Sequence, residues 1–243
     1  MSNQKIALIT GGDKGIGKGI VEVLAEEGYR VFFTYRNNIE DAKQIENKYH
    51  KVSSLQFDAG DKNSIAHLID DLSEMNITID ILINNVGIDR DAVCYKMNFD
   101  SWYEVIYINL VQIFHLTKAF VPGMILKSWG RIINISSIGA FQGSYGKTNY
   151  AASKAGIIGF SKALALELAN KGITVNTICP GAFDTSMFRR IPEKYRDIII
   201  SQIPMKRLGN PKEIGYLVKY LISNEASYMT GQTLHLNGGW FFG

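Results

Sequence analysis

Short apolar runs recur along the chain, separated by longer stretches with helical periodicity. Most of the runs are apolar at consecutive positions, which is typical of parallel strands covered by helices on both faces. Their alternation with helical stretches indicates βαβ units. The runs are KIALIT, RVFFTY, VSSLQF, IDILIN, GRIINIS, ITVNTI and TLHLN, starting at residues 5, 30, 52, 79, 130, 173 and 233. The pattern predicts an α/β fold: a Rossmann-type, doubly wound, mostly parallel sheet of seven strands with helices on both faces.

The helical stretches 15–28 and 151–170 fall between strands, where crossover connections belong. No internal repeat, low-complexity tract or Pro/Gly-rich linker divides the chain, so we expect residues 1–243 to form a single dinucleotide-binding and catalytic domain. The segment at about 183–210 differs, since it is rich in turn residues and carries one short helical pattern at 193–201. A long segment after the carboxyl end of a strand suggests a lid over a substrate site.

The helical run from Trp102 to Phe120 is apolar nearly all round, whereas a surface helix would be amphipathic. One face can pack on the sheet, and we expect the other to pack on a second subunit, although a loop could cover it instead. The aromatic end Trp240-Phe241-Phe242 also favours burial against another chain. Both features support the hypothesis of a homotetramer with two-fold symmetry.

Hydrophobic residues make up 46% and charged residues 20% of the chain, which is ordinary for a soluble globular protein. The formal net charge is only +3, and the basic residues mostly alternate with acids, which argues against nucleic-acid binding. Cys94 and Cys179 lack the spacing of a disulfide framework or a metal site, so we expect no metal and a reducing compartment. The first ten residues lack a signal-peptide pattern, and no run comes near the length of about 18 apolar residues that spans a membrane. These observations favour a cytoplasmic protein with no membrane partner.

A glycine-rich turn follows the first apolar run and precedes a helix-forming stretch from Lys18 to Glu27. A strand that turns sharply into a helix lets a pyrophosphate approach the backbone, where N–H groups and the helix dipole favour negative charge. Glycines alone could be simple turn formers, but their place between the first strand and the first helix is the context that a dinucleotide site requires. The candidate residues are Thr10, Gly11, Gly12, Lys14, Gly15, Ile16 and Gly17.

The end of the second apolar run bears on the choice of cofactor. Sites for NAD usually place an Asp or Glu there to bind the ribose 2′-hydroxyl, whereas this chain reads Phe33-Thr34-Tyr35-Arg36-Asn37. Arg36, together with Lys14 of the glycine-rich turn, offers the cations that a 2′-phosphate needs. The sequence therefore favours NADP(H), although both residues could be solvated charges without a ligand.

Tyr150 and Lys154 lie four residues apart at the start of a helical stretch, so their side chains share one face. A free tyrosine titrates near pH ~10, and a nearby ammonium stabilises its phenolate and lowers that pKa. Reduction of a ketone needs a hydride on carbon and a proton on oxygen, which a tuned phenol beside a hydroxyl donor such as Ser137 can manage. A Tyr-x-x-x-Lys pair by itself is usually only a contact on a helix surface. Its weight comes from its combination with the glycine-rich turn.

These features together resemble the short-chain dehydrogenase/reductase family over essentially the whole chain. The motifs are TGGDKGIG at 10–17, NNVG at 84–87, Asn109, Ser137 and YAASK at 150–154. The resemblance implies that Tyr150 is the general acid, that Lys154 lowers its pKa and binds the nicotinamide ribose, and that Ser137 holds the substrate carbonyl. It also implies that Asn109 anchors a water in a proton relay.

The same resemblance assigns further residues to the cofactor, each of which could instead serve only the fold. These are Asp58 at the adenine, Asn85 and Gly87 at the adenosine side, and Pro180, Gly181 and Thr185 at the nicotinamide. Two positions depart from the family pattern, since Val86 stands where an alanine is usual and Ala59 where a valine is common. A larger Val86 could crowd the cofactor, so these departures bear on affinity and leave the reaction type unchanged.

Within the family, the stretches IDRDAVCYKM, GRIINISSIGAFQGSYGKTNYAASKAG and LNGGWFFG are most similar to bacterial acetoacetyl-CoA reductases, with 3-oxoacyl-[acyl-carrier-protein] reductases close behind. The first resemblance implies NADPH-dependent reduction of a short-chain 3-oxoacyl thioester, acetoacetyl-CoA, to the (R)-3-hydroxyacyl thioester, a precursor of polyhydroxyalkanoate. The second implies a step of fatty-acid synthesis on acyl carrier protein. A dehydrogenase of another alcohol or ketone and a non-catalytic NADP(H)-binding regulator are the alternatives. The intact set of catalytic residues disfavours the regulator.

Several polar residues near these motifs are candidates for binding the substrate. The resemblance places Asp91, Ser137, Tyr145 and Lys147 at the thioester pocket, where Tyr145 could pack on an acyl or pantetheine chain. Basic residues could meet either the phosphates of coenzyme A or an acidic carrier protein, or could be solvated charges only. The candidates are Arg189, Arg190 and Lys194 for coenzyme A, and Arg131 and Lys171 for the carrier protein.

Overall fold

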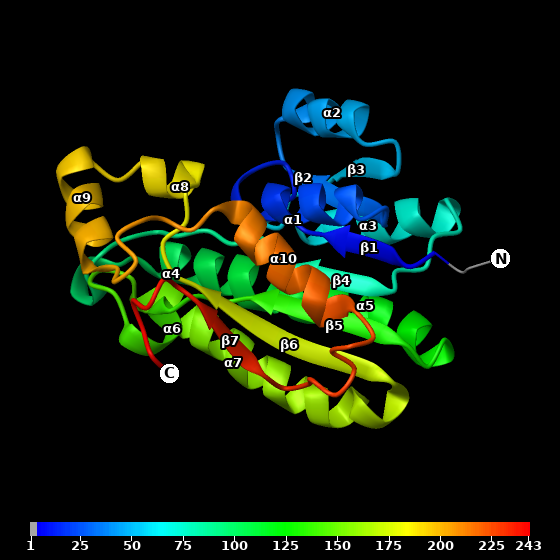
Figure 1. Ribbon diagram of the computed structural model, residues 1–243. Helices are drawn as coiled ribbons and strands as arrows, with labels where there is room; N and C mark the ends of the chain where they lie inside the picture. Colours follow the sequence, from blue (N-terminus) through cyan, green and yellow to red (C-terminus); the bar gives the residue numbers. More distant parts are fainter. Residues whose placement is uncertain (1–3) are drawn as a thin grey trace.

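All seven predicted strands form, and they pair in parallel within one sheet of order β3-β2-β1-β4-β5-β6-β7. The computed structural model describes residues 4–243, and its sheet is shown in Figure 1. The strands are β1 (Ile6–Ile9), β2 (Arg30–Tyr35), β3 (Val52–Gln56), β4 (Ile81–Asn84), β5 (Gly130–Ile135), β6 (Ile173–Pro180) and β7 (Thr233–Leu236). The order reverses between β1 and β4, and in open parallel sheets a ligand binds outside the carboxyl ends of the strands at such a point. The predicted fold class is confirmed.

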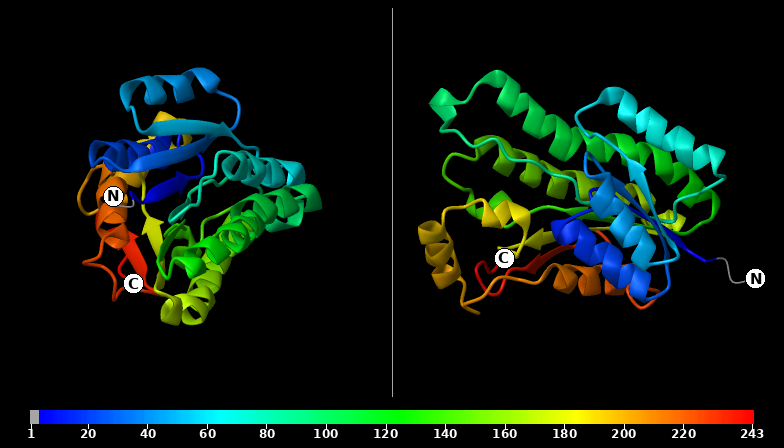
Figure 2. Two further views of the ribbon diagram at one scale, coloured as in Figure 1. Left: turned by 90° about the vertical axis from the view of Figure 1, so that its right-hand side faces the viewer. Right: turned by 90° about the horizontal axis from the view of Figure 1, so that it is seen from above.

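Helices cover both faces of the sheet, as the left view of Figure 2 shows. On one face lie α1 (Gly15–Glu26), α2 (Ile39–Lys48) and α10 (Pro211–Ile222). On the other lie α3 (Lys62–Glu74), α4 (Phe99–Ile106), α5 (Gln112–Leu126) and α7 (Thr148–Leu168). The shorter elements are the 3₁₀ turns Cys94–Lys96 and Ala169–Lys171, α6 (Gly139–Gln142), α8 (Ser186–Arg189) and α9 (Glu193–Gln202).

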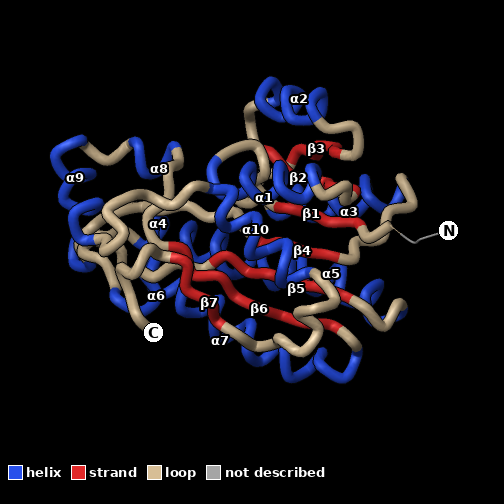
Figure 3. The backbone as a smooth tube through the Cα atoms, in the orientation of Figure 1, coloured by secondary structure: helices blue, strands red, loops and turns tan. Residues whose placement is uncertain are grey.

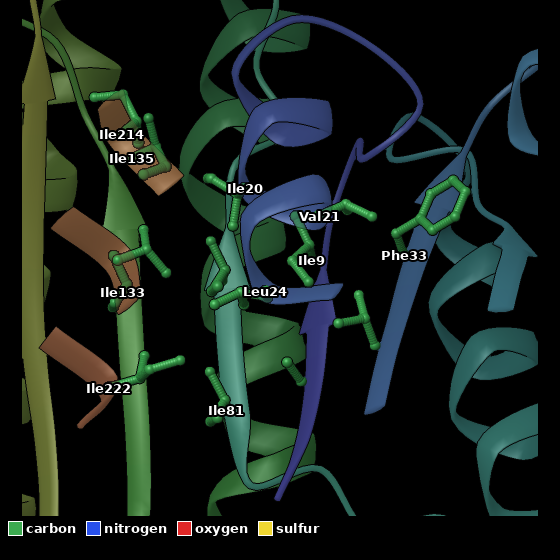
Figure 4. Packing of buried hydrophobic residues seen from close by; sticks show 14 of the residues in the cluster. Ile9, Ile20, Val21, Leu24, Phe33, Ile81, Ile133, Ile135, Ile214 and Ile222 are labelled. Atoms are coloured by element: carbon green, nitrogen blue, oxygen red, sulfur yellow. The ribbon is translucent and has the colours of Figure 1, made fainter. Parts of the chain in front are cut away.

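Successive residues of each strand point to opposite faces, which explains the uninterrupted apolar runs. In β4, Ile81 and Ile83 join the core under α1 and α10, while Leu82 joins the core under the other helices. Figure 4 shows the first of these cores, in which side chains of α1 and α10 meet those of the central strands. Because helices pack on both faces of the sheet, the strands are held firmly in place. Their carboxyl ends therefore provide a fixed edge for the site.

The longest helical run joins α4 to α5 through a π-helical turn, Tyr107–Val111. Its 28 residues, Phe99–Leu126, are long and apolar enough, by length and composition alone, to cross a membrane, so the prediction that no run comes near that length is wrong. A core helix of a soluble protein passes the same test, and Ile108, Leu116 and Met124 are buried in the second core. The opposite face of the run is exposed and aromatic, as expected for a second packing surface.

The segment expected to be a lid folds as two short helices, α8 and α9, where the sequence pattern predicted one. Both extend beyond the carboxyl edge of the sheet in Figure 1, and Figure 3 shows that the long loops gather at the same end. A bridge between Phe183 and Gly209 joins the two ends of the segment. The segment is therefore attached to the edge where a ligand is expected, and its action as a lid stays a prediction.

Candidate active site

The residues expected at the site come together because each follows the carboxyl end of a parallel strand. Thr10 follows β1, Asn85 follows β4, Ser137 lies just beyond β5, and Gly181 follows β6. Tyr150 and Lys154 are brought to this edge by the first two turns of α7, which packs against β6. The sequence prediction of one shared site is thus consistent with the topology.

The glycine-rich turn has the geometry that a pyrophosphate requires. Gly15 has φ +54°, a left-handed conformation that favours glycine, and a side chain at Gly17 would collide with the carbonyl oxygen of Gly11. Helix α1 begins at Gly15 after Lys14, with no side-chain cap and no acidic residue in its first turn. Its first N–H groups are therefore free of a capping carboxylate, and the helix dipole favours an anion there. These residues fit a dinucleotide cofactor.

Neighbouring side chains hold this turn in place. The amides of Gly11 and Gly12 donate to the side chain and the carbonyl of Thr34, at 2.9 Å each. Asn85 Nδ2 donates to the carbonyl oxygens of Thr10 (2.9 Å) and Gly11 (3.1 Å), so its amide braces the loop. This contact gives Asn85 a structural role, which the sequence analysis left open beside its expected contact with the cofactor.

Val86, one of the departures from the family pattern, packs over the same turn. A Cβ at Gly11 would lie 3.0 Å from its Cγ2. The extra bulk of valine therefore occupies space next to the glycine-rich turn, and its effect on cofactor affinity stays a prediction.

The two cations expected to bind a 2′-phosphate are both exposed. Arg36 Nε donates to Asp58 Oδ2 at 3.0 Å, and Lys14 lies 3.7 Å from Asp13. Asp58 also accepts from the amide of Gly60 at 2.8 Å. The pair joins the residue expected at the phosphate to the residue expected at the adenine, so both lie at one end of the cofactor site.

The Tyr150, Lys154 and Ser137 side chains form a compact group. A Cβ at Gly139 would lie 3.4 Å from Ser137 Oγ and 3.7 Å from Tyr150 Cε1, so the hydroxyl and the ring face the same small space. Lys154 Nζ lies 5.7 Å from the centroid of the Tyr150 ring and donates to the carbonyl oxygen of Ile135 at 2.8 Å. Only 3% of Lys154 is exposed, and no carboxylate within the described residues pairs with it. Burial lowers the pKa of Lys154 to about 8.

The pKa of Tyr150 is raised in the protein alone, which is opposite to the direction expected from the sequence. Burial is the largest cause, and hydrogen bonding with Ser137 and the positive charge of Lys147 oppose it. Lys154 is not among the groups that shift it. The expected lowering by Lys154 is absent in the protein alone, and a lower pKa would require further positive charge, such as that of an oxidised nicotinamide.

Asn109 lies in the π-helical turn, a rare element that is frequent at functional sites. Its Nδ2 donates to the carbonyl of Ile88 (3.0 Å) and to Ser153 Oγ (3.1 Å), and its Oδ1 accepts from the amide of Ile88 at 2.8 Å. Both N–H groups are thus committed, and Oδ1 keeps one free acceptor position. A Cβ at Gly87 would lie 3.2 Å from Lys154 Nζ and 3.5 Å from this Oδ1, so the two polar atoms lie close together. The predicted water relay would have to use that oxygen.

The substrate candidates share one rim of the site. Lys147 Nζ lies 2.9 Å from Asp91 Oδ2 and 3.1 Å from Asp89 Oδ2, whereas the side chain of Tyr145 is 93% exposed. Asp89 and the fully buried Asn149 were missed by the sequence reasoning. Asn149 Nδ2 donates to the carbonyl of Arg90 at 3.0 Å and ties the start of α7 to the loop after β4. Their proximity to the motifs in sequence was the only available signal.

Two of the basic candidates are less available than the sequence suggested. Arg131 is wrong as a carrier-protein contact, because it is 3% exposed, with its guanidinium 4.5 Å from the ring of Trp129. Arg189 is paired with Asp184 at 2.8 Å, so its charge is partly satisfied within the segment. Arg190 lies 3.7 Å from Asp89, and Lys194 and Lys171 are exposed. Lys171 lies at the amino end of β6, away from Tyr150.

Comparison with known proteins agrees with this geometry. A family model described as "Enoyl-(Acyl carrier protein) reductase" matches residues 11–241. The chain belongs to the short-chain dehydrogenase/reductase family. It is 42% identical to the 3-oxoacyl-[acyl-carrier-protein] reductase FabG of Vibrio harveyi, with 98% of this chain and 97% of that relative covered. It is 43% identical to the acetoacetyl-CoA reductase of Rhizobium meliloti (98% and 99%) and 45% identical to nodulation protein G of Azospirillum brasilense (98% and 98%).

Membership of this family makes the protein an oxidoreductase that acts on a carbonyl or hydroxyl group with a nicotinamide cofactor. No cluster of three or more His, Cys, Asp or Glu side chains that could hold a metal is found in residues 4–243.

The lowered pKa of Lys154 predicts a pH dependence of stability. Between pH 8 and 10.5 the unfolded chain holds a proton on this lysine that the folded chain has released, so stability rises with pH in that window. Relative to Lys154→Met, the free energy of unfolding of the cofactor-free protein should rise by up to about 1.4 kcal/mol per pH unit, as measured by urea unfolding. The exposed Lys162 on the same helix is the control, since Lys162→Met should leave the pH dependence unchanged. A flat or falling difference for Lys154→Met would contradict the assignment.

Proposed function

We propose that the protein catalyses NADPH-dependent reduction of a short-chain 3-oxoacyl thioester, acetoacetyl-CoA, to the (R)-3-hydroxyacyl thioester. The observation that carries the proposal is the meeting of Tyr150, Ser137 and Lys154 beside a turn built to approach a pyrophosphate. The printed names of relatives that cover nearly the whole chain support the 3-oxoacyl substrate. The alternative substrate is the same acyl group on acyl carrier protein.

The protein side of the reaction follows from the positions of these groups. When bound, the nicotinamide supplies the hydride that adds to the carbonyl carbon and is oxidised in the process. Ser137 Oγ donates a hydrogen bond to the carbonyl oxygen and stabilises the charge that develops there. Tyr150 gives its proton to that oxygen as general acid, and Lys154 stabilises the phenolate that remains. The product is a secondary alcohol with the thioester intact.

NADPH is favoured over NADH because of the charges at the end of β2. Arg36 lies where an acid would bind a ribose 2′-hydroxyl, and Lys14 adds a second exposed cation in the adjoining turn. An arginine can bind a phosphate with two parallel hydrogen bonds. Its present partner, Asp58, is exposed as well, so the pair can exchange for a phosphate at low cost.

We also propose that the protein is a cytoplasmic homotetramer without nucleic-acid or membrane partners. Phe99, Tyr103 and Tyr107 stack along the long helix with ring centroids 6.2 Å apart, and the first two are largely exposed. An exposed aromatic row on an otherwise apolar helix supports contact with another subunit. The C-terminal aromatics are partly used within the chain, since Phe241 stacks on Phe141 at 5.3 Å.

The substrate proposal is tested by following oxidation of the cofactor at about 340 nm with matched thioesters. Turnover of acetoacetyl-CoA with NADPH should exceed turnover of acetoacetyl-[acyl carrier protein] by about tenfold or more, a difference of about 1.4 kcal/mol in transition-state binding. A preference for the carrier-bound substrate would move the protein to fatty-acid synthesis. Absence of turnover with both thioesters would refute the 3-oxoacyl substrate.

The cofactor proposal predicts a selective effect of Arg36→Ser. Loss of the charged hydrogen bonds should raise the KM for NADPH by about ten- to a hundredfold and leave the KM for NADH nearly unchanged. Arg30→Ser, at the opposite end of the same strand, is the matched control and should alter neither KM. Equal losses with both cofactors would mean that Arg36 does not read the 2′-phosphate.

A further inference from the structure

Two lysine ammonium groups lie near the ring of Tyr150, and the proposed function uses only one of them. Nζ of Lys154 is 5.7 Å from the ring centroid, and Nζ of Lys147 is 5.6 Å from it. Lys147 is the N-cap residue of α7 and precedes Tyr150 by three positions. A second cation therefore lies about as close to the centre of the Tyr150 ring as the lysine of the Tyr-x-x-x-Lys motif.

The ammonium of Lys147 is fixed by two carboxylates. It lies 3.1 Å from Asp89 Oδ2 and 2.9 Å from Asp91 Oδ2, and both acids belong to the loop after β4. The Lys147 side chain is 29% exposed and that of Asp89 23%, so this pair is partly shielded from solvent, whereas Asp91 is exposed. Burial lowers the pKa of Lys147, but the two aspartates outweigh it and the net direction is upward. The two aspartates therefore favour the charged form of Lys147.

Backbone contacts hold the two segments in register around these charges. The amide of Ala92 donates to the carbonyl of Gly146 at 2.8 Å. Asn149 Nδ2 donates to the carbonyl of Arg90 at 3.0 Å, and its Oδ1 accepts from the amide of Tyr150 at 2.7 Å. These contacts fix the loop that carries Asp89 and Asp91 relative to the start of α7, and the two ion pairs then hold the Lys147 ammonium near Tyr150.

The charges that face Tyr150 act in opposite directions. Lys147 favours the phenolate and lowers the pKa of Tyr150, after burial and the Ser137 hydrogen bond, whereas Asp89 and Asp91 raise it. Lys154 also lies near the ring but is not among the groups that shift this pKa, and the buried thiol of Cys179 lies on the Lys154 side. Arg190 of the segment expected to be a lid lies 3.7 Å from Asp89 Oδ1 and offsets part of that negative charge. Lys147 is the cation nearest the two acids, so it opposes most directly their effect on the pKa of Tyr150.

We propose that Lys147, held between Asp89 and Asp91, is a positioning residue that stabilises the phenolate of Tyr150 as its proton passes to the substrate oxygen. This differs from the direct contact with substrate that the sequence suggested, because both carboxylates already occupy the ammonium. The inference rests on the proposed role of Tyr150 as general acid. Asp89 acts in the opposite sense, because its negative charge raises the pKa of Tyr150.

The test is the pH profile of kcat/KM for reduction of acetoacetyl-CoA by NADPH. Reduction requires protonated Tyr150, so the rate falls as pH rises through its titration. Lys147→Met should move this limb to higher pH by ~0.5–1 unit, because the phenolate loses a nearby cation. Asp89→Asn should move the limb to lower pH, and Lys147→Arg should leave it close to wild type. Lys51→Met, a distant exposed lysine, controls for the change in net charge.

Opposite shifts in Lys147→Met and Asp89→Asn would support the proposal, since a merely structural role would not reverse sign with charge. If Lys147→Met raises the KM for acetoacetyl-CoA and leaves the limb at its wild-type pH, Lys147 only binds substrate and the proposal is overturned. NADPH affinity, measured by fluorescence titration, checks that each variant is folded. If Lys147→Met does not fold, Asp89→Asn keeps the test decisive, because an unmoved limb in that variant would overturn the proposal.

Tyr150→Phe separates failure of this inference from failure of the proposed function. If Tyr150→Phe keeps full activity, the general-acid assignment and the role of Lys147 both fail. If Tyr150→Phe is inactive and Lys147→Met leaves the limb unmoved, the role of Lys147 alone fails.

Discussion

The site depends on one interaction, the hydrogen bond by which the buried ammonium of Lys154 is held at the carbonyl of Ile135. A charged amine taken out of water without a carboxylate partner is costly, and here one hydrogen bond to the carbonyl of Ile135 at the end of β5 takes the place of the usual ion pair. The parallel sheet makes this possible, because β5 is buried on both faces and delivers a carbonyl to a fixed point. The same edge carries the glycine-rich turn, so the lysine and the cofactor site are positioned by one framework.

The residues around this lysine are either small or already hydrogen-bonded within the protein. Gly87 leaves the space next to Nζ open, and the amide of Asn109 is held by the backbone of Ile88 within a π-helical turn. Burial raises the pKa of Tyr150, whereas it lowers the pKa of Lys154. A poor acid that becomes a better one only when further positive charge arrives suits an enzyme whose cofactor becomes cationic as the hydride leaves.

The fold could be predicted closely from the sequence because doubly covered parallel strands are apolar at consecutive positions, as in residues 81–83 of β4. Thr10, Asn85, Ser137 and Gly181 could be placed at one edge because each follows a strand, and α7 brings Tyr150 and Lys154 to the same edge. Contacts between distant loops could not be predicted, since the pairing of Lys147 with Asp89 depends on how the loop after β4 meets the start of α7. Arg131 was misjudged because a basic residue at the start of a strand reads as exposed, yet its guanidinium packs on Trp129. The π-helical turn left no mark on the apolar pattern, which is continuous through Asn109.

The central claim is that a nicotinamide hydride reduces the 3-oxo group of an acyl thioester at this site. It is tested most directly by incubating the protein with acetoacetyl-CoA and NADPH that carries deuterium at both C4 positions, and analysing the product by mass spectrometry and NMR. The account predicts (R)-3-hydroxybutyryl-CoA with one deuterium, located at C3, and one NADP⁺ formed per product. Absence of deuterium at C3, or formation of product without oxidation of the cofactor, would contradict it.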